Sequence, residues 1–236
     1  MTTTPPTDRP HRLEPPTSLA HLHSRHPWIV PVTAACFVLL AIGAAFDWLP
    51  WDEPLARAAV RAREPWSDEL ARRVSYMGST YVVLSVAACA AVAASLRSRS
   101  LAVAIVVIAL ARPLAEFTLK ELIDRPRPVG NRLVAGTGPS FPSGHPLATA
   151  ASWCLIPLVL ELYTRRKALW WASVVVVWTL AAAVAVSRVW LGVHWPSDVV
   201  GGLLLAVLGV AAAEHVMDRA ESRPNPGQRR RRRSAT

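Results

Sequence analysis

Residues 168–186 read ALWWASVVVVWTLAAAVAV, an apolar run that contains no charged side chain. A helix needs about 20 such residues to cross the hydrocarbon core of a membrane, because it rises about 1.5 Å per residue. Hydrophobic residues make up 52% of the 236-residue chain, and charged residues make up only 18%. The run therefore predicts a membrane-spanning helix, and the composition predicts further spans elsewhere in the chain.

Similar apolar stretches lie before and after this run, and they differ in how clearly they reach the length of a span. The first two are clear spans like 168–186, whereas the third carries charges and the fourth ends at Glu161. The last is long enough only if it includes 195–198 and 214–217. We predict an all-α polytopic membrane protein, a six-transmembrane-helix bundle. Apart from 168–186, its stretches are 28–46, 77–96, 101–119, 146–163 and 199–213.

Basic residues predict the orientation of this bundle. Arg97 and Arg99 lie between the second and third stretches, and the Arg-Arg-Lys of 165–167 lies between the fourth and fifth. Because loops rich in Lys and Arg stay in the cytoplasm, we expect both termini to be cytoplasmic. The arginines within 57–73 argue against this orientation, but acidic residues and tryptophans accompany them, which is typical of a segment in the membrane interface. These tryptophans are Trp48, Trp51 and Trp66.

The two ends of the chain differ in composition from 27–218, the predicted membrane domain. Residues 1–26 are polar and proline-rich, which predicts a disordered cytoplasmic tail. Residues 219–236 form a basic cytoplasmic tail, whose arginine run 229–233 contributes to the net charge of +10. The positive-inside bias or contact with anionic lipid headgroups explains this charge better than nucleic-acid binding does. The first tail also holds histidines that are better explained as flexible than as metal ligands: His21, His23 and His26.

Polar residues gather at the ends of the predicted spans. An odd-numbered span that starts inside ends outside, and the next even-numbered span begins there. The polar groups that follow the third span, open the fourth, close the fifth and open the sixth should therefore meet on the extracytoplasmic face. They are Lys120 and Arg127-Pro128, then Ser143-Gly144-His145, then Ser187-Arg188, and finally His194 and Asp198.

These polar residues are suited to binding a phosphoryl group. Lys120, Arg127 and Arg188 supply positive charge, and an arginine fork matches phosphate oxygens in bidentate geometry. Ser143 offers a hydroxyl group, and Gly144 lets backbone N–H groups approach an anion without a side chain between them. Two helix amino-termini add the positive ends of their dipoles.

The histidines provide the chemistry. His194 and Asp198 are four residues apart at a helix start, so the carboxylate can hold one ring nitrogen and leave the other free as a nucleophile. His145 comes from another helix and can protonate a leaving oxygen, which predicts a two-step displacement through a phosphohistidine. A zinc site at His194 and Asp198 would need a further ligand and would be repelled by the nearby cations, so we expect no metal and no other cofactor.

The motif as a whole resembles the type 2 phosphatidic acid phosphatase family, which includes lipid phosphate phosphatases and polyprenyl diphosphate phosphatases. The pattern is Lys-x6-Arg-Pro, then Pro-Ser-Gly-His, then Ser-Arg-x5-His-x3-Asp. The resemblance implies a metal-free six-helix membrane phosphatase with His194 as nucleophile, Asp198 as its partner and His145 as general acid. It also implies a set of phosphate-binding residues: Lys120, Arg127, Ser143, Gly144 and Arg188.

One feature lies outside this motif. Arg112, Glu116 and Lys120 repeat every four residues, so they share one face of the third predicted helix. Charges at this depth seldom face lipid, so this face should point into the bundle. Our hypothesis is that Glu116 orients Lys120 while Arg112 neutralises Glu116. An ion pair that only fixes helix packing is an equally good explanation.

The expected partner is a membrane lipid whose chain stays in the bilayer. A polyprenyl diphosphate is the first choice of substrate, and phosphatidic acid or phosphatidylglycerol phosphate is the second. The near absence of lysine is typical of a GC-rich bacterial genome, so we expect the bacterial inner membrane, with the site on its extracytoplasmic face. Alternatives are a phosphotransferase with a lipid or sugar acceptor, a vanadate-dependent haloperoxidase, and a non-enzymatic lipid-binding membrane protein.

Overall fold

The computed structural model describes the backbone of residues 27–221 and the side chains of residues 27–212, and the histidines and arginine run of the two tails lie outside these residues. Within the described part, the secondary structure is entirely helical, as expected. The helices are α2 (Ile29–Ala45), α3 (Asp52–Arg61), α4 (Pro65–Tyr76), α5 (Thr80–Ser95), α6 (Arg99–Ile123), α7 (Gly144–Trp153), α8 (Leu155–Glu161), α9 (Lys167–Trp190) and α10 (Pro196–Glu221).

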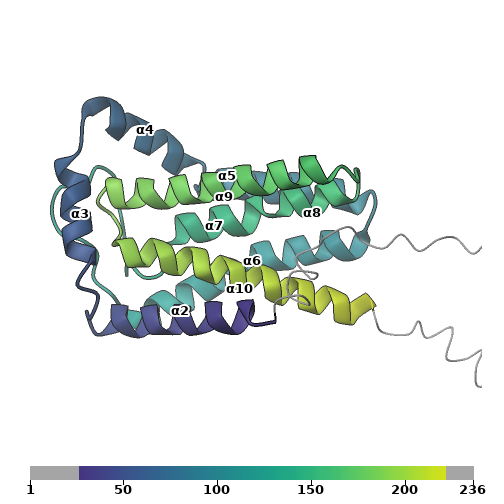
Figure 1. Ribbon diagram of the computed structural model, residues 1–236, viewed down its shortest axis with the longest axis horizontal. Coiled ribbons are helices and arrows are strands. Elements are labelled where there is room, and N and C mark those ends of the chain that lie inside the picture. The colour runs from purple at the N-terminus through teal and green to yellow at the C-terminus, as the bar shows by residue number, and fades with distance from the viewer. Residues whose placement is uncertain (1–26, 222–236) are drawn as a thin grey trace, which may run out of the picture.

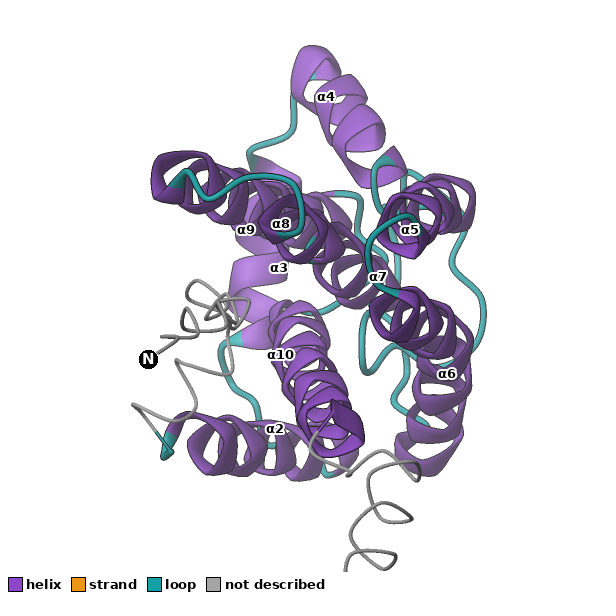
Figure 2. Ribbon diagram, turned by 90° about the vertical axis from the view of Figure 1, so that its right-hand side faces the viewer, coloured by secondary structure: helices purple, strands orange, loops and turns teal. Residues whose placement is uncertain are grey.

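The long helices form a bundle, and two short helices lie across one of its ends. Figure 1 shows α5, α6, α9 and α10 running along the long axis, with α3 and α4 at one end. The view along the bundle places α7 in the middle, where it contacts α5, α6, α9 and α10, while α2 packs on α10 (Figure 2). The amino-terminus of α7 is therefore held inside the bundle.

The helices match the expected apolar stretches in position but not always in length. By length and composition, α6 and α9 can each cross a membrane, and the pair α4 and α5, bent by 40°, counts as a third candidate. The stretches 28–46 and 77–96, which the sequence marks as clear spans, become helices of 17 and 16 residues. The charged third stretch becomes a 25-residue helix, because it continues to Ile123, before Asp124 in the left-handed region.

Small residues let the segment before α7 pack tightly against α10. A Cβ atom on Gly201 would lie 2.6 Å from the ring of Phe141, and one on Gly202 would lie 2.5 Å from the carbonyl oxygen of Ser143. These glycines therefore serve packing inside the chain, one of the two uses that close helix packing allows. Gly209 has open space around its Cβ position and is not needed for this contact.

The segment that follows α2 forms the two short helices α3 and α4 at one end of the bundle. Trp48, Trp51 and Trp66 are exposed at 68%, 47% and 71%, and their place in a membrane interface stays a prediction. The loop is also tied to the bundle, because Arg63 donates to the carbonyl oxygens of Trp190 and Asn131. The expected interfacial segment thus forms α3 and α4, which both contact α9, while α3 also contacts α10.

Candidate active site

His194 and Asp198 lie where α9 turns into α10. Gly192, at φ +73°, makes the turn possible, and Asp198 occupies the first turn of α10. Asp198 Oδ2 lies 3.4 Å from His194 Nδ1 and accepts the backbone N–H of Trp195 at 2.8 Å. Both side chains are buried, with Asp198 at 0% and His194 at 3% exposure. The carboxylate therefore caps its own helix and orients the imidazole ring.

A contact on the other side of the His194 ring indicates which ring nitrogen carries the proton. Arg127 Nη1 lies 3.1 Å from His194 Nε2. Because arginine can only donate hydrogen bonds, Nε2 must accept here, and the ring proton sits on Nδ1 toward Asp198. Burial lowers the pKa of His194 to about 4, against the opposing hydrogen bond and charge of Asp198. The ring is then neutral at neutral pH, as a nitrogen nucleophile requires.

Arg127 is fixed in place by backbone carbonyl groups. Its guanidinium donates to Val193 at 2.8 Å, and to other carbonyls in the loop before α7. Burial lowers its pKa, and the charge of Asp198 opposes this shift. The guanidinium is therefore anchored beside Nε2, and Nε2 becomes accessible to a ligand when this one hydrogen bond is given up. The further acceptors are Thr137, Gly138 and Pro139.

The Ser143-Gly144 pair opens α7 as expected and is held against two other helices. Ser143 donates its backbone N–H to the carbonyl oxygen of Asp198 at 2.9 Å. Its hydroxyl group is buried and has no hydrogen-bond partner within the described residues. A Cβ atom on Gly144 would lie 2.0 Å from Glu116 Oε1, so a larger residue would displace the Glu116 carboxylate from its ion pairs. The free hydroxyl is suited to bind an oxygen of a ligand.

Arg188 and His145 complete the group around His194. Arg188 donates from Nη1 to Ser75 Oγ at 2.7 Å, whereas its buried Nε finds no acceptor in the part of the chain described. His145 lies in the first turn of α7, partly exposed, where the charges of Arg188 and Lys120 act on it along with His194. The structure thus brings together the side chains that the sequence assigned to the nucleophile, the acid and phosphate binding.

Arg112, Glu116 and Lys120, here called the α6 stripe, form a chain of ion pairs. Glu116 accepts from Lys120 Nζ at 2.8 Å and from Arg112 Nη1 at 2.8 Å, through different carboxylate oxygens. The three side chains are 13–19% exposed, which agrees with a face that points into the bundle. Glu116 also lies against Gly144, so the stripe contacts the turn that opens α7 directly.

Sequence reasoning missed part of the site. Arg125, which the sequence analysis did not assign to the site, is 3% exposed and donates to Asp198 Oδ1 at 2.8 Å. Asp52, also 3% exposed, pairs with Arg125 from the other side. The doubled Arg-Pro of residues 125–128 was a visible signal for Arg125. Asp52 had no such signal, because it lies far away in the chain.

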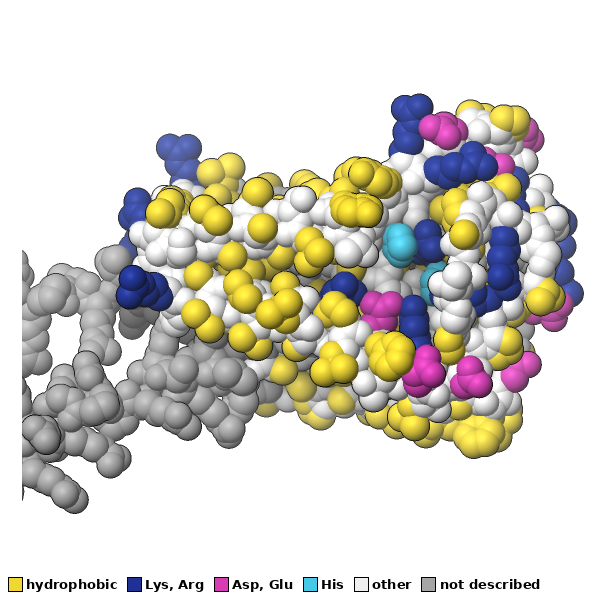
Figure 3. Space-filling model, turned by 180° about the vertical axis from the view of Figure 1, so that it is seen from behind, with side chains coloured by type: hydrophobic (Ala, Val, Ile, Leu, Met, Phe, Trp, Pro, Cys, Tyr) yellow, Lys and Arg dark blue, Asp and Glu magenta, His cyan; other side chains and the backbone are white. Residues whose placement is uncertain are grey.

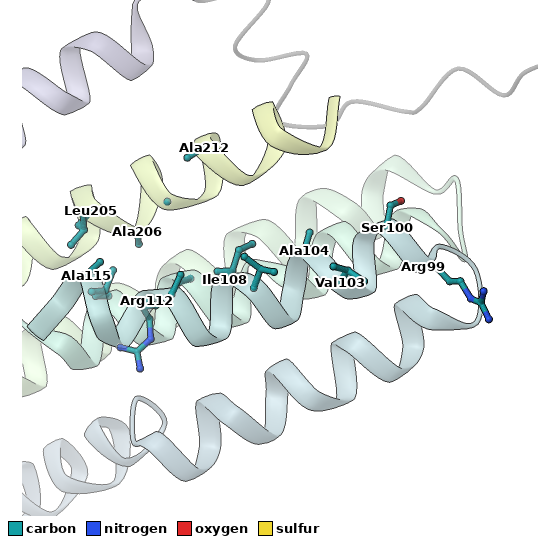
Figure 4. A pocket seen from close by; sticks show the side chains of 15 residues that line it. Arg99, Ser100, Val103, Ala104, Ile108, Arg112, Ala115, Leu205, Ala206 and Ala212 are labelled. Atoms are coloured by element: carbon teal, nitrogen blue, oxygen red, sulfur yellow. The ribbon is translucent and has the colours of Figure 1, made fainter. Parts of the chain in front are cut away.

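An apolar cavity runs along the bundle toward the α6 stripe and the start of α7. It has a volume of about 670 Å³ and lies between α6, α7 and α10. Figure 4 shows its lining from Arg99 and Ser100 at one end to Arg112 and Ala115 at the other. Leu147, two residues beyond His145, also lines it. The cavity is therefore adjacent to the α6 stripe and to the first turns of α7.

The surface of the molecule separates an apolar body from a more polar end. Hydrophobic side chains cover the body of the bundle (Figure 3). Histidine and acidic side chains lie toward the end that carries α3 and α4, together with many basic ones, and further basic side chains lie at the opposite end. No group of three or more His, Cys, Asp or Glu side chains that could hold a metal occurs among the described residues. The site thus consists of a buried histidine among arginines and a lysine at the end of an apolar bundle. This arrangement is typical of a membrane phosphatase.

Comparison with known proteins agrees with this class. The family model of the PAP2 superfamily matches residues 100–221. Phosphatidylglycerophosphatase B of Bacillus subtilis (strain 168) is 30% identical over 165 residues, which cover 66% of this chain and 78% of that protein. The chain belongs to the PAP2 superfamily, which confirms the family resemblance of the motif, and it is a lipid phosphatase.

Three further similarities concern one sequence relative and two solved structures. The putative undecaprenyl-diphosphatase YbjG of Escherichia coli (strain K12) is 36% identical over 115 residues, or 46% of this chain and 54% of that protein. The crystal structure of a transmembrane PAP2 type phosphatidylglycerolphosphate phosphatase from Bacillus subtilis has a TM-score of 0.72 and 24% identity, covering 81% of this chain and 98% of that chain. LpxE from Aquifex aeolicus has a TM-score of 0.56 and 23% identity, covering 71% and 96%. These two structures share the fold.

Proposed function

We propose that this chain removes phosphate from a lipid phosphate or diphosphate through a covalent intermediate on His194, without a metal. The observation that carries the proposal is the state of His194: buried, held by Asp198 at Nδ1, and presenting an unprotonated Nε2 to Arg127. A neutral imidazole beside fixed cations is suited to attack an anionic phosphoryl group.

The reaction then has two steps. In the first, Arg127 gives up its hydrogen bond to His194 Nε2, which then forms a bond to phosphorus while the bond from phosphorus to the lipid oxygen breaks. His145, in its protonated form, donates a proton to that oxygen and becomes neutral. In the second, water attacks the phosphohistidine, His145 takes a proton from the water, and the bond from phosphorus to nitrogen breaks. Inorganic phosphate leaves, and both histidines return to their starting states.

The residues around His194 divide the work of holding the phosphoryl group. Ser143 Oγ and Arg188 Nε are buried donors without partners in the described structure, so they can bind its oxygens without first breaking another hydrogen bond. Lys120 and Arg127 add charge, and the backbone at Gly144 adds the amino-terminus of α7. This donor set is matched to the charge that builds on the equatorial oxygens.

The substrate class follows from the cavity and from the relatives. An apolar cavity beside the α6 stripe fits a hydrocarbon chain whose headgroup reaches His194. Relatives are named for phosphatidylglycerol phosphate and for undecaprenyl diphosphate, and the one aligned over more of this chain is the phosphatidylglycerophosphatase. We therefore place phosphatidylglycerol phosphate first and polyprenyl diphosphate second, reversing the order expected from the sequence. Phosphatidic acid remains a third candidate.

The same proposal includes the topology. The six apolar helical segments would each span the bilayer, with both termini in the cytoplasm and the site on the extracytoplasmic face of the bacterial inner membrane. Exposed basic side chains at Arg97, Arg99 and 165–167, at the connections between α5 and α6 and between α8 and α9, support this orientation. Residues 27–218 would form the phosphatase domain, with the tails 1–26 and 219–236 outside it.

Phosphate release by the purified protein in detergent, with EDTA present, tests this function. The panel would hold phosphatidylglycerol phosphate, polyprenyl diphosphate and phosphatidic acid, and wild type would be compared with His194→Ala. We expect release that survives the chelator and is lost in the variant. Activity that disappears with EDTA would contradict the metal-free mechanism. A lipid product carrying a transferred phosphoryl group, without free phosphate, would indicate a phosphotransferase.

A further inference from the structure

Behind His194, on the side away from Arg127, lies a second polar group with no exposed member. Arg125 Nη1 donates to Asp198 Oδ1 at 2.8 Å and to Ser197 Oγ at 2.7 Å, and its Nη2 donates to Asp52 Oδ2 at 2.7 Å. Its guanidinium also lies 5.6 Å from the centre of the Trp195 ring. The exposures are 3% for Arg125, 1% for Ser197 and 0% for Asp198. We call Asp52, Arg125, Ser197 and Asp198 the buried network.

Asp52 ties the first loop to the start of α10. Its Oδ1 accepts the backbone N–H of Ser197 at 2.8 Å, and its Oδ2 accepts the Ser197 hydroxyl group. The backbone N–H groups in the first turn of a helix lack partners within the helix, so Asp52 caps α10 from α3. Both oxygens of Asp52 are thus engaged with Arg125 or Ser197, and the carboxylate is 4% exposed.

We propose that Arg125 and Asp52 are positioning residues, which act through Asp198 to hold His194 in its reactive orientation and tautomer. The proposal rests on the proposed role of His194 as nucleophile. Arg125 binds Oδ1 of Asp198, which leaves Oδ2 directed at the His194 ring and at the N–H of Trp195. Asp52 in turn fixes the fork of Arg125 and the helix start that carries Asp198.

The charges of the buried network explain why both residues are needed. Asp52 and Asp198 are two buried carboxylates around Ser197, and without a cation between them one would be driven to take up a proton. Arg125 lies between them and pairs with both, at 2.7 and 2.8 Å, and its Nη2 also lies 3.9 Å from the solvent-exposed carboxylate of Asp47. The three ionised groups together carry one negative charge, which suits the positive charge that His194 develops during the reaction.

The buried network should affect the titration of His194, whereas residues that serve only packing should not. The charged and titratable groups that face His194 are Asp198 of α10, Arg127 of the loop between α6 and α7, Arg188 of α9 and His145 of α7. Removing a negative or a positive charge behind Asp198 should shift the titration of His194 in opposite directions. Asp52→Asn should make the ring harder to protonate, and Arg125→Gln should make it easier.

The experiment measures kcat, KM and the titration of His194 on matched variants in detergent. The His194 resonance in histidine-labelled protein is assigned by its loss in His194→Gln. We expect kcat to fall about 100-fold in Arg125→Gln and about 10-fold in Asp52→Asn, with KM changed less than about threefold, because a small misplacement of the reacting group has effects of this size. Arg125→Lys should recover part of the loss.

Controls separate positioning from folding. Glu53→Gln removes the neighbouring carboxylate on α3, whose pair with Arg57 at 2.7 Å is exposed, and should leave kcat and the His194 titration unchanged. If Arg125→Gln does not fold, the double variant with Asp52→Asn removes the repulsion between the buried carboxylates. That double variant should keep a low kcat while its His194 titration returns toward the wild-type value.

The outcomes are distinct from those that bear on the proposed function. A kcat within twofold of wild type in Asp52→Asn and Arg125→Gln would overturn the positioning role. The positioning role would also be overturned if kcat fell but the His194 titration did not change in either variant. A shift of the titration in the same direction in both variants would overturn it as well. If wild type released no phosphate, the proposed function would fail, yet the His194 titration would still test whether the buried network acts on that ring.

Discussion

The α6 stripe and the buried network are both chains of charged side chains around an ion pair, but they differ in exposure and in how the sequence encodes them. The stripe members are 13–19% exposed, and they repeat every four residues on one helix. In the buried network, the ionised members are 0–4% exposed and come from α3, the loop after α6, and α10. This difference in exposure indicates different roles, because the stripe can touch a ligand whereas the buried network can act only through His194.

This comparison predicts separable kinetic effects. Changes in the stripe should act mainly on substrate affinity, because Lys120 is a candidate ligand of the phosphoryl group. Changes in the buried network should act mainly on turnover, because its members cannot reach the substrate. A stripe variant that changed mainly kcat, or a buried-network variant that changed mainly KM, would weaken the comparison.

The largest effect is expected at Asp198, where the buried network meets the nucleophile. Asp198→Asn should lower kcat on the order of 1000-fold with little change in KM, because an amide cannot hold the His194 tautomer and offset its developing charge. Steady-state phosphate release checks this value. A loss confined to KM would contradict the assignment of Asp198 as the partner of the nucleophile.

The next effect is expected in the stripe. Lys120→Met should raise KM, with kcat/KM lower by roughly 10- to 100-fold, since a hydrogen bond to a charged group contributes about 1.5–3 kcal/mol. The measurement is the dependence of initial rate on lipid mole fraction in mixed micelles. An unchanged KM would mean that Lys120 does not touch the substrate phosphate.

Acid should destabilise the folded protein through His194. Burial lowers its pKa from the ordinary value of 6.5 to about 4, so the unfolded chain binds the proton more tightly, and stability is lost as pH falls from 6.5 toward 4. Between pH 7 and pH 5 the loss from this group is about 2 kcal/mol. Thermal unfolding at the two pH values should show a smaller difference in His194→Gln than in wild type. Equal differences would contradict the burial of a neutral ring.

The smallest effect is expected at Glu116, which the sequence already suggested as a residue that orients Lys120. Glu116→Gln should raise KM by about fivefold, because it weakens one charge-assisted hydrogen bond without removing Lys120. Glu121→Gln, next to Lys120 but on an exposed position of α6, is the matched control and should be neutral. If Glu116→Gln leaves both kcat and KM unchanged, the ion pairs of the stripe serve helix packing alone.

The sequence was most informative where the relevant contacts are local. The helical repeat predicted the stripe, and the spacing of His194 and Asp198 predicted their contact, because residues four apart share a helix face. The apolar stretches predicted the positions of the helices. Their lengths were less predictable, because helix ends depend on turns such as the left-handed Asp124 rather than on hydrophobicity.

The buried network could not be predicted in the same way. Asp52 and Arg125 are 73 residues apart, and their contact depends on how the first loop folds over the bundle end. In the sequence, Arg125 resembles any arginine near a membrane interface, and Asp52 resembles any acidic residue of an amphipathic loop. Only their placement behind Asp198 gives them a role in the reaction.

The most direct test of the covalent mechanism is to trap the phosphoryl group on the protein. Wild type would be mixed with lipid substrate labelled in its phosphate, quenched in alkali within the first turnover, and digested to locate the label. We expect an alkali-stable, acid-labile label on the peptide that contains His194, and no label in His194→Ala. A label on another residue, or rapid turnover by His194→Ala, would contradict a phosphohistidine at this position.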